Sequence, residues 1–461
     1  MSKISKILSL LMLAALLLSA CGPKATQAPA ATEAPAVTEA PAATQAPGAT
    51  EAATQAATGA PTTAPSGEKV TITLATWAGA DEAKELQGVI DKVNAEATDF
   101  QIVHQAIPSD YYTKVQTMIA GNTPPDLMWL SQEFVANYAD NGAIMDITDQ
   151  VAGLSDMPAA KLDDYYPGSI AVAKYQDRLY GLPWIAQPVV LYYNPDMFEK
   201  AGISPPDESW TWDTFKDAAK KLTLKDASGN ITQYGTTFSG WPPIQMFIWQ
   251  AGGEVITPDL KSSPIDTPEA IQGAQFYADL IYNPDYAVPE DVIKEQGFGE
   301  MAKAGKVAMF FGGAADDFDY AWQKDPKNAK MLMALVPKGP KDRTTFAWTA
   351  ITAVSSQTKN PDLAVKAMVA LTEGIHHWKV LAPRKSLASA DVIAAAVPGK
   401  KDSAPVILQA AESMRSFNVV PKHSDWDTIF WEQFQDPLFH KKGTAADLAA
   451  AARPKLEEVL P

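Results

Sequence analysis

Residues 69–77 read KVTITLATW, and residues 81–96 read DEAKELQGVIDKVNAE. The first segment alternates in hydrophobicity, which predicts a β-strand, and the second repeats apolar residues at helical spacing, which predicts an amphipathic helix. A strand-like segment FQIVHQAI follows at 100–107, then a helix, the short apolar strand DLMWL at 126–130, and another helix from about Ser131. This alternation indicates an α/β fold built on a mainly parallel, doubly wound sheet.

The same kind of pattern continues along the rest of the chain. A helix is predicted from Trp212 to about Leu222 with Thr211 as its N-cap, because its apolar residues share one face. Further helices are expected at 268–282, 297–304, 361–371 and 444–459, and further strands at 306–311, 331–336 and 349–354.

The composition excludes several functional classes. The chain has 461 residues and a formal net charge of −16, with 54 acidic against 38 basic side chains, which argues against nucleic-acid binding. Cys21 is the single cysteine, so no intramolecular disulfide can form. The five histidines show no zinc-ligand spacing. We therefore expect no metal and no cofactor.

The N-terminus predicts secretion and anchoring. Residues 1–20 carry two lysines before an apolar stretch that is too short to span a membrane stably, which is typical of a signal peptide. The sequence LSAC ending at Cys21 matches the lipobox of bacterial lipoproteins. This match implies that Cys21 is acylated and anchors the mature chain to the cell membrane. A buried free cysteine behind an ordinary secretory signal is the alternative.

A linker separates this anchor from the folded part. Residues 22–66 repeat hexapeptides such as ATQAPA and ATEAPA and contain no aromatic residue. Such a segment cannot bury enough apolar surface to offset its ordering entropy, so we expect residues 21–67 to be a disordered tether that begins with the lipidated cysteine. A glycosylated stalk is the alternative. What remains, residues 68–461, is long enough for two lobes.

Several motifs then occur in a recognisable order. They are TWAG (76–79), GNTPPDLMWLSQEFVANYADNGAIMDIT (121–148), LYGLPWIAQPVVLYYNPDMFEKAGI (179–203), WQAGGEVI (249–256), GKVAMFFGG (305–313) and PRKSLAS (383–389). Through them, nearly all of the folded part resembles the carbohydrate-type extracellular solute-binding proteins of ABC importers, a maltose-binding-protein-like family of sugar-binding lipoproteins.

The resemblance implies a two-lobe periplasmic-binding-protein type II fold of the α/β class, with a ligand cleft between the lobes. One lobe would comprise residues 68–190 with about 351–385, and the other 191–350 with about 386–461. The crossing strands would be PVVLYY and TFAWTAI. It further implies a monomeric protein that captures a mono- or oligosaccharide outside the cytoplasm and delivers it to the permease subunits of an ABC importer.

Candidate ligand contacts follow from what a sugar requires. It presents hydroxyl groups and apolar C–H faces, so its site needs aromatic rings together with carboxylate, amide or guanidinium partners. Trp77 follows the first strand, at the edge where open α/β sheets bind ligands, and Asp81 starts the next helix. Asp126 and Trp129 flank the exit of the third strand, and Gln132 opens the following helix.

Five more candidates lie later in the chain. Trp241 occupies a proline-rich loop with few packing partners, and Gly312 could let a ligand approach the backbone. Arg384 could donate a planar pair of hydrogen bonds to vicinal hydroxyls, with an inter-lobe salt bridge as its alternative. By the resemblance, Trp348 lies on a cleft-lining crossing strand. Trp426 is expected in a loop before a helix.

Every candidate also has a structural alternative. For the tryptophans it is packing, and for Asp126 it is a turn. We interpret five other tryptophans as core residues: Trp210, Trp212, Trp322, Trp378 and Trp431.

An enzyme is the alternative function. A glycoside hydrolase needs only two carboxylates about 5 to 10 Å apart in an aromatic cleft, and this acidic chain offers many pairs. The order of motifs and the tether favour a binding protein instead, so we expect no enzymatic activity. A surface adhesion protein would share the lipobox and linker but would not explain two βα lobes.

Overall fold

The computed structural model describes residues 69–461 except 239–240, 317 and 379–380. The expected signal peptide, the lipidated Cys21 and the linker lie outside the described residues. The described strands form a ten-stranded sheet with the path β2-β1-β3-β11-β6-β9-β8-β7, from which β10 and β12 branch, and a separate pair β4-β5. No described helix is long and apolar enough to cross a membrane.

The N-terminal half of the sheet is parallel. β1 (Val70–Thr76) pairs in parallel with β2 (Phe100–Ala106) and β3 (Leu127–Ser131). The helices that connect or follow these strands are α2 (Ala80–Glu96), α3 (Tyr111–Ala120) and α4 (Gln132–Asp140). These six elements confirm the alternating strands and helices that the sequence predicts.

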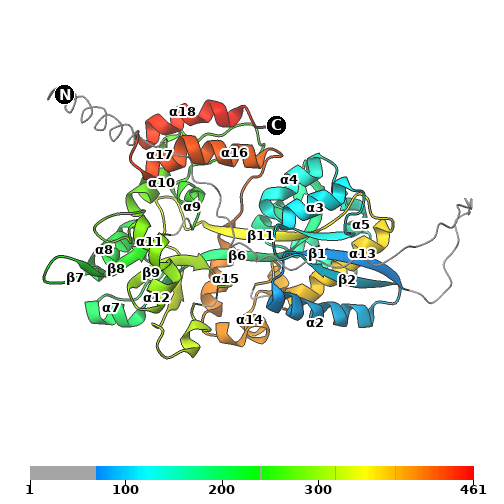
Figure 1. The fold of residues 1–461 in the computed structure, drawn as a ribbon, viewed down its shortest axis with the longest axis horizontal. Coiled ribbons are helices and arrows are strands. Elements are labelled where there is room, and N and C mark those ends of the chain that lie inside the picture. Colours follow the sequence, from blue (N-terminus) through cyan, green and yellow to red (C-terminus); the bar gives the residue numbers. More distant parts are fainter. Residues whose placement is uncertain (1–68, 239–240, 317, 379–380) are drawn as a thin grey trace, which may run out of the picture. The chain divides into compact units, whose positions relative to one another are not determined.

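The two longest strands run through the middle of the sheet (Figure 1). β6 (Gly181–Tyr193) pairs antiparallel with β11 (Thr345–Val354), and β11 pairs antiparallel with β3. β6 also pairs antiparallel with β9 (Val307–Gly313). The expectation of a mainly parallel sheet is therefore wrong at the centre. The chain passes from one half to the other in single extended strands without a crossover helix, so neighbouring strands there run in opposite directions.

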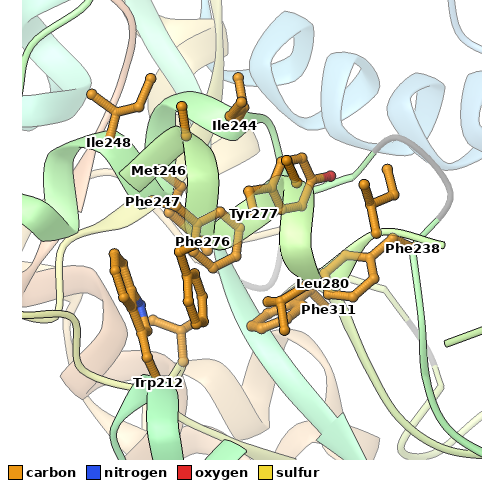
Figure 2. Packing of buried hydrophobic residues seen from close by; sticks show 14 of the residues in the cluster. Trp212, Phe238, Ile244, Met246, Phe247, Ile248, Phe276, Tyr277, Leu280 and Phe311 are labelled. Atoms are coloured by element: carbon orange, nitrogen blue, oxygen red, sulfur yellow. The ribbon is translucent and has the colours of Figure 1, made fainter. Parts of the chain in front are cut away.

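The second half of the sheet carries the helices with the largest buried rings. β8 (Ile231–Thr237) pairs in parallel with β9, and α8 (Trp212–Leu222) begins with the expected Thr211 cap, whose side chain accepts from the Thr214 amide. α9 (Ile244–Ala251) is buried along its whole length, and α10 (Pro268–Leu280) packs against it. Figure 2 shows the resulting cluster, in which Trp212 stacks on Phe276 at 3.9 Å between ring centroids.

The remaining elements are shorter or lie toward the C-terminus. The strands are β4 (Lys174–Tyr175), β5 (Arg178–Leu179), β7 (Leu224–Lys225), β10 (Leu332–Ala334) and β12 (Met414–Arg415). The helices are α5 (Thr148–Ala152), α6 (Pro167–Ala171), α7 (Pro195–Ala201), α11 (Glu290–Gln296), α12 (Phe298–Lys303), α13 (Pro361–His376), α14 (Ala390–Ala396), α15 (Ala404–Glu412), α16 (His423–Phe430), α17 (Asp436–Phe439) and α18 (Ala445–Glu457). Short 3₁₀ turns lie at Pro158–Ala160, Leu162–Asp164, Trp322–Lys324, Lys385–Leu387 and Pro398–Lys400, and a π-helical turn at Trp431–Gln435.

Two large groups of buried side chains lie on the two halves of the sheet. The first core contains residues of β1, β2, β3, α2 and α13, and the second core contains residues of β9, α8, α9, α10 and α18. Trp348 of β11 packs against both cores. One of the tryptophans interpreted as core is not: Trp431 is 46% exposed, because it follows α16 on its outer side.

Candidate functional site

A group of tryptophans lies at one edge of the sheet. The carboxyl ends of β1 and β3 share this edge because the two strands are parallel. Trp77 follows β1, and its ring centroid lies 5.3 Å from that of Trp129, 6.2 Å from Trp184 and 6.3 Å from Trp348. Trp129 and Trp184 are buried and stack at 4.1 Å. The half-buried rings of Trp77 and Trp348 are thus the accessible part of this group.

Trp348 of β11 has polar neighbours on both adjacent strands, Ser131 on β3 and Gln187 on β6. Its Nε1 donates a hydrogen bond to Ser131 Oγ at 3.0 Å, and Ser131 Oγ donates in turn to the Glu133 carboxylate. On the other side of β11, Gln187 of β6 is its direct partner in the strand register. Directly paired residues project to the same face of a sheet, so the Gln187 side chain starts on the face that carries the indole, while its amide reaches toward Asp316 on the β9 side.

The aromatic surface continues along β11 toward the second core. Phe346 precedes Trp348 by two residues and therefore projects to the same face of the strand. Its ring centroid is 5.1 Å from that of Trp241 and 4.6 Å from that of Phe417. Phe346 is 1% exposed, so it supports its neighbours and offers no face of its own. We call the half-buried rings of Trp77, Trp348 and Trp241, together with the buried Phe346, the aromatic track.

A hollow of about 260 Å³ adjoins the track on the side of the second core. Its lining combines rings with polar groups: Gln187, Trp241, Phe298, Phe311, Gly312, Gly313, Asp316 and Phe318. The Asp316 carboxylate accepts from Gln187 Nε2 at 3.0 Å and from the Gly313 amide at 2.8 Å. A Cβ at position 313 would come within 1.7 Å of Gln187 Nε2, so any other residue there would displace the Gln187 amide.

A larger cavity lies elsewhere in the described part of the chain. It measures about 790 Å³ and runs between α8 and α10, with lining residues that include Trp212, Lys216, Gln272 and Asp279. Its two rings, Trp212 and Phe276, are nearly buried and stack on each other, so they offer little face to a ligand. Trp77 follows the carboxyl end of β1, where open α/β sheets bind ligands, and Trp348 and Trp241 offer half-buried rings, so we take the track as the candidate site.

Four of the residues predicted from sequence meet at this site. Trp77, Trp241 and Trp348 belong to the track, and Gly312 lines the hollow, where an added Cβ would lie 2.9 Å from the Tyr192 ring. Their role as ligand contacts is a proposal that rests on this arrangement.

Three other predicted residues lie around the track without forming its surface. Trp129 is fully buried behind Trp77. Gln132 is also fully buried, and its Oε1 has no hydrogen-bond partner among the described residues. Asp81 is exposed in the first turn of α2.

Asp126 is occupied by the structure of its own lobe. Its carboxylate accepts from the amide of Thr73 at 2.9 Å, from Thr73 Oγ1 at 2.8 Å and from Thr358 Oγ1 at 2.6 Å. These bonds join the start of β3 to β1, so we do not retain Asp126 as a ligand contact.

Arg384 is likewise occupied. It is 4% exposed, and its guanidinium donates to Asp164 Oδ2 at 2.9 Å and to the Glu373 carboxylate. It also donates to His376 Nδ1 at 3.4 Å. The Arg384 guanidinium is thus held in salt bridges with Asp164 and Glu373, and we withdraw it as a sugar contact. All three residues lie in the same expected lobe, so the salt bridge is not the inter-lobe one that was the alternative.

The expected loop position of Trp426 is wrong. Trp426 lies within α16, is 1% exposed and stacks on Phe430 at 4.8 Å between ring centroids. The two residues are four apart and so share one face of the helix, which packs into the second core. Trp426 is therefore a core residue.

Sequence reasoning missed Gln187, Phe346 and Asp316, and named Glu133 only as one of the polar residues that open the helix after the third strand. Gln187 left a readable signal, because it is the one amide within the otherwise apolar or aromatic strand GLPWIAQPVVLYY. Asp316 left none, since its closeness to Gln187 depends on strand pairing between distant segments. No cluster of three or more His, Cys, Asp or Glu that could hold a metal ion occurs in the described part of the chain.

Comparison with known sequences identifies the family. Residues 78–373 match the family described as bacterial extracellular solute-binding protein. A protein of Brucella abortus named as a binding protein is 25% identical over 282 residues, which cover 59% of this chain and 65% of the relative. A maltotriose-binding protein of Pyrococcus abyssi is 24% identical, with 47% and 45% covered. An sn-glycerol-3-phosphate-binding periplasmic protein of Escherichia coli is 27% identical, with 54% and 50% covered. The chain thus spans less than two thirds of the length of these curated relatives.

Solved structures share the fold. An ABC substrate-binding protein of Listeria monocytogenes, in complex with cycloalternan, superposes with a TM-score of 0.70 at 21% identity, covering 85% of this chain and 99% of its own. A maltose-bound protein of T. maritima superposes with a TM-score of 0.66 at 19% identity, covering 85% and 100%. The fold is therefore the two-lobe α/β type II fold of periplasmic binding proteins, as expected. With a family match over well more than half of its length, the chain belongs to the bacterial extracellular solute-binding proteins.

Proposed function

We propose that this protein captures a carbohydrate in the cleft between its lobes and delivers it to the permease subunits of an ABC importer. The observation that carries the proposal is the aromatic track, which runs along β11 from Trp77 at the first core to Trp241 at the second. Rings of this kind offer flat apolar faces to sugar C–H groups, and Glu133, Gln187 and Asp316 offer hydrogen-bond partners to hydroxyls.

The relatives support the proposal. Those named for a ligand bind maltotriose or sn-glycerol 3-phosphate, and solved neighbours hold cycloalternan or maltose. The family and these neighbours are solute-binding proteins, so we do not carry the glycoside hydrolase forward. The family's description as extracellular supports a location outside the cytoplasm.

The proposal includes three features inferred from sequence alone. Acylated Cys21 would hold the chain on the membrane, and residues 21–67 would act as the tether. The lobes would comprise residues 68–190 with about 351–385, and 191–350 with about 386–461, in a monomeric protein. Mass spectrometry of the membrane-extracted protein tests the first feature: a diacylglyceryl modification on Cys21 is expected, and an unmodified chain that begins before Cys21 would exclude it.

A thermal-shift screen against neutral oligosaccharides, monosaccharides and polyols tests the function. A ligand at 100 times its dissociation constant adds about 2.7 kcal/mol to the free energy of unfolding, which gives a readily measured shift. Chromatography of each bound sugar completes the test. We expect a shift with the sugar recovered intact; a panel without any shift, or a cleaved sugar, would contradict the proposal.

A further inference from the structure

We propose that the cleft selects uncharged carbohydrates over phosphorylated or carboxylated ones, and that Glu133 and Asp316 impose this selection. The inference rests on the proposed function and narrows the class of cargo. It separates this chain from its glycerol-phosphate-binding relative, which is 27% identical to it.

The two carboxylates flank the central ring of the track. In the sheet, β11 lies between β3 and β6. From the β3 side, Glu133 reaches Trp348 through the hydroxyl of Ser131, which links the carboxylate to the indole Nε1. From the β6 side, Asp316 binds Gln187, the strand partner of Trp348. A sugar that stacks on Trp348 and extends across β6 toward the end of β9 would therefore have a carboxylate on each side of it.

Carboxylates of this kind suit hydroxyl groups and oppose anions. An ionised carboxylate only accepts hydrogen bonds, so it pairs with a hydroxyl donor but offers nothing to the oxygens of a phosphate dianion. Two like charges a few ångströms apart repel strongly at the effective dielectric of a protein surface. An anionic group between Glu133 and Asp316 would be repelled from both sides.

The cation beside Asp316 is already paired: Lys400 Nζ donates to the Asp316 backbone carbonyl and forms a buried ion pair with the Asp319 carboxylate at 2.6 Å. No lysine or arginine is among the described residues that line the hollow or whose rings contact the track. Arg415 stacks on Trp249 at 4.4 Å from the ring centroid and pairs with Glu254. His423 faces Glu133 and Asp427, but burial lowers its pKa, so it is neutral near pH 7.

The length of the track favours more than one sugar ring. Phe346 and Trp348 are two residues apart, which separates them by roughly 6.6 Å along the strand. The Trp77 ring lies 6.3 Å from that of Trp348, and the Trp241 ring lies 5.1 Å from that of the buried Phe346, so the accessible faces are those of Trp77, Trp348 and Trp241. A single glycerol phosphate would leave most of this surface uncovered.

Calorimetric titration of the purified protein tests the selection. The uncharged probes are maltotriose, cellotriose and xylotriose, and the anionic probes are sn-glycerol 3-phosphate, glucose 6-phosphate and trigalacturonate. We expect at least one uncharged probe to bind at least tenfold more tightly than every anionic probe. Anionic probes that bind as tightly or more tightly would overturn the selection while leaving carbohydrate capture intact. If none of the six probes binds, the proposed function falls and the inference falls with it.

Charge-removing variants assign the effect to the two residues. In Glu133→Gln and Asp316→Asn we expect roughly tenfold weaker binding of the uncharged probe, because a charge-assisted hydrogen bond is lost. The preference for uncharged over anionic probes should shrink by at least tenfold in the double variant. Asp91→Asn is the control, because it removes an equal charge from the exposed face of α2. It should change neither the affinity for the uncharged probe nor the preference for uncharged over anionic probes. A double variant with an unchanged preference would refute the assignment.

Ionic strength provides a second readout that requires no variant. If repulsion excludes anions, added salt should strengthen the binding of trigalacturonate to the unmodified protein, because screening weakens like-charge repulsion. The uncharged probes should be insensitive to salt. Binding of the anionic probe that weakens with salt would point to an attractive site and contradict the inference.

Discussion

At the scale of single residues, the account depends on Trp348 and Trp241. Replacing either ring with alanine removes a stacking face, and Trp348→Ala also removes the hydrogen bond to Ser131. We predict that each change weakens carbohydrate binding about tenfold or more, since aromatic contacts contribute about 0.5 to 1.5 kcal/mol beyond the area they bury. Calorimetry measures this loss. Trp431→Ala is the control: it removes an exposed ring that contacts no residue of the track, so this variant should bind sugar normally. If Trp348→Ala and Trp241→Ala both bind sugar with unaltered affinity, the track is not the binding site.

Gly313 gives a second prediction at this scale. An alanine Cβ there would collide with the Gln187 amide, which must then leave Asp316. We predict that Gly313→Ala lowers both the midpoint of thermal unfolding and the affinity for sugar. Gly88→Ala is the matched control, because its Cβ meets nothing within 4 Å on α2 and alanine is the better helix former. Equal effects of the two changes would show that the close approach at position 313 is unimportant.

At the scale of elements, α13 carries a buried histidine with a clear protonation state. Arg384 can only donate, so His376 Nδ1 accepts from it and Nε2 carries the hydrogen that reaches the Pro183 carbonyl at 2.9 Å. Burial, together with the nearby guanidinium, lowers the pKa of His376 to about 3. Its ordinary value in the unfolded chain is about 6.5.

This difference makes stability depend on pH. Between about pH 6.5 and pH 3 the unfolded chain binds a proton that the folded chain does not, so the free energy of unfolding falls as the pH falls, by at most about 1.4 kcal/mol per pH unit. We predict that His376→Gln, which keeps an amide donor for Pro183, flattens this part of the profile. Urea unfolding at pH 7 and pH 4.5 measures it. A variant whose stability falls as steeply as that of the parent would contradict the assignment.

The elements also show what sequence can predict here. Strands and helices from β1 to α4, the Thr211 cap and the long helix at α13 follow local periodicity and were predictable. The antiparallel centre of the sheet and the flanking of Trp348 by two carboxylates depend on which strands pair, which local periodicity does not encode. The prediction that Trp426 lies in a loop was wrong for a related reason: its burial depends on the packing of α16 onto the second core, which local periodicity does not encode.

At the scale of the whole folded part, two strands join the two cores. β6 and β11 pair with each other over most of their length, and Asn137 Nδ2 of α4 also donates to the Pro421 carbonyl at 3.0 Å, close to α16. These contacts bridge elements of the first and second cores. We propose that the lobes close on a bound ligand and that this strand pair acts as the hinge.

Small-angle scattering tests this closure. We predict that the radius of gyration decreases when the protein is saturated with a sugar that binds, because a ligand that contacts both lobes favours the closed state. Trp348→Ala at the same sugar concentration should show a smaller change. A radius that is identical with and without bound sugar would contradict closure.

The central claim is that the aromatic track is where a carbohydrate binds. A crystal structure of the protein with the tightest-binding uncharged oligosaccharide tests it most directly. We predict sugar rings stacked on Trp348 and Trp241, with hydroxyl groups donating to Glu133 and Asp316. Sugar bound instead in the larger cavity between α8 and α10, with the track vacant, would contradict the account.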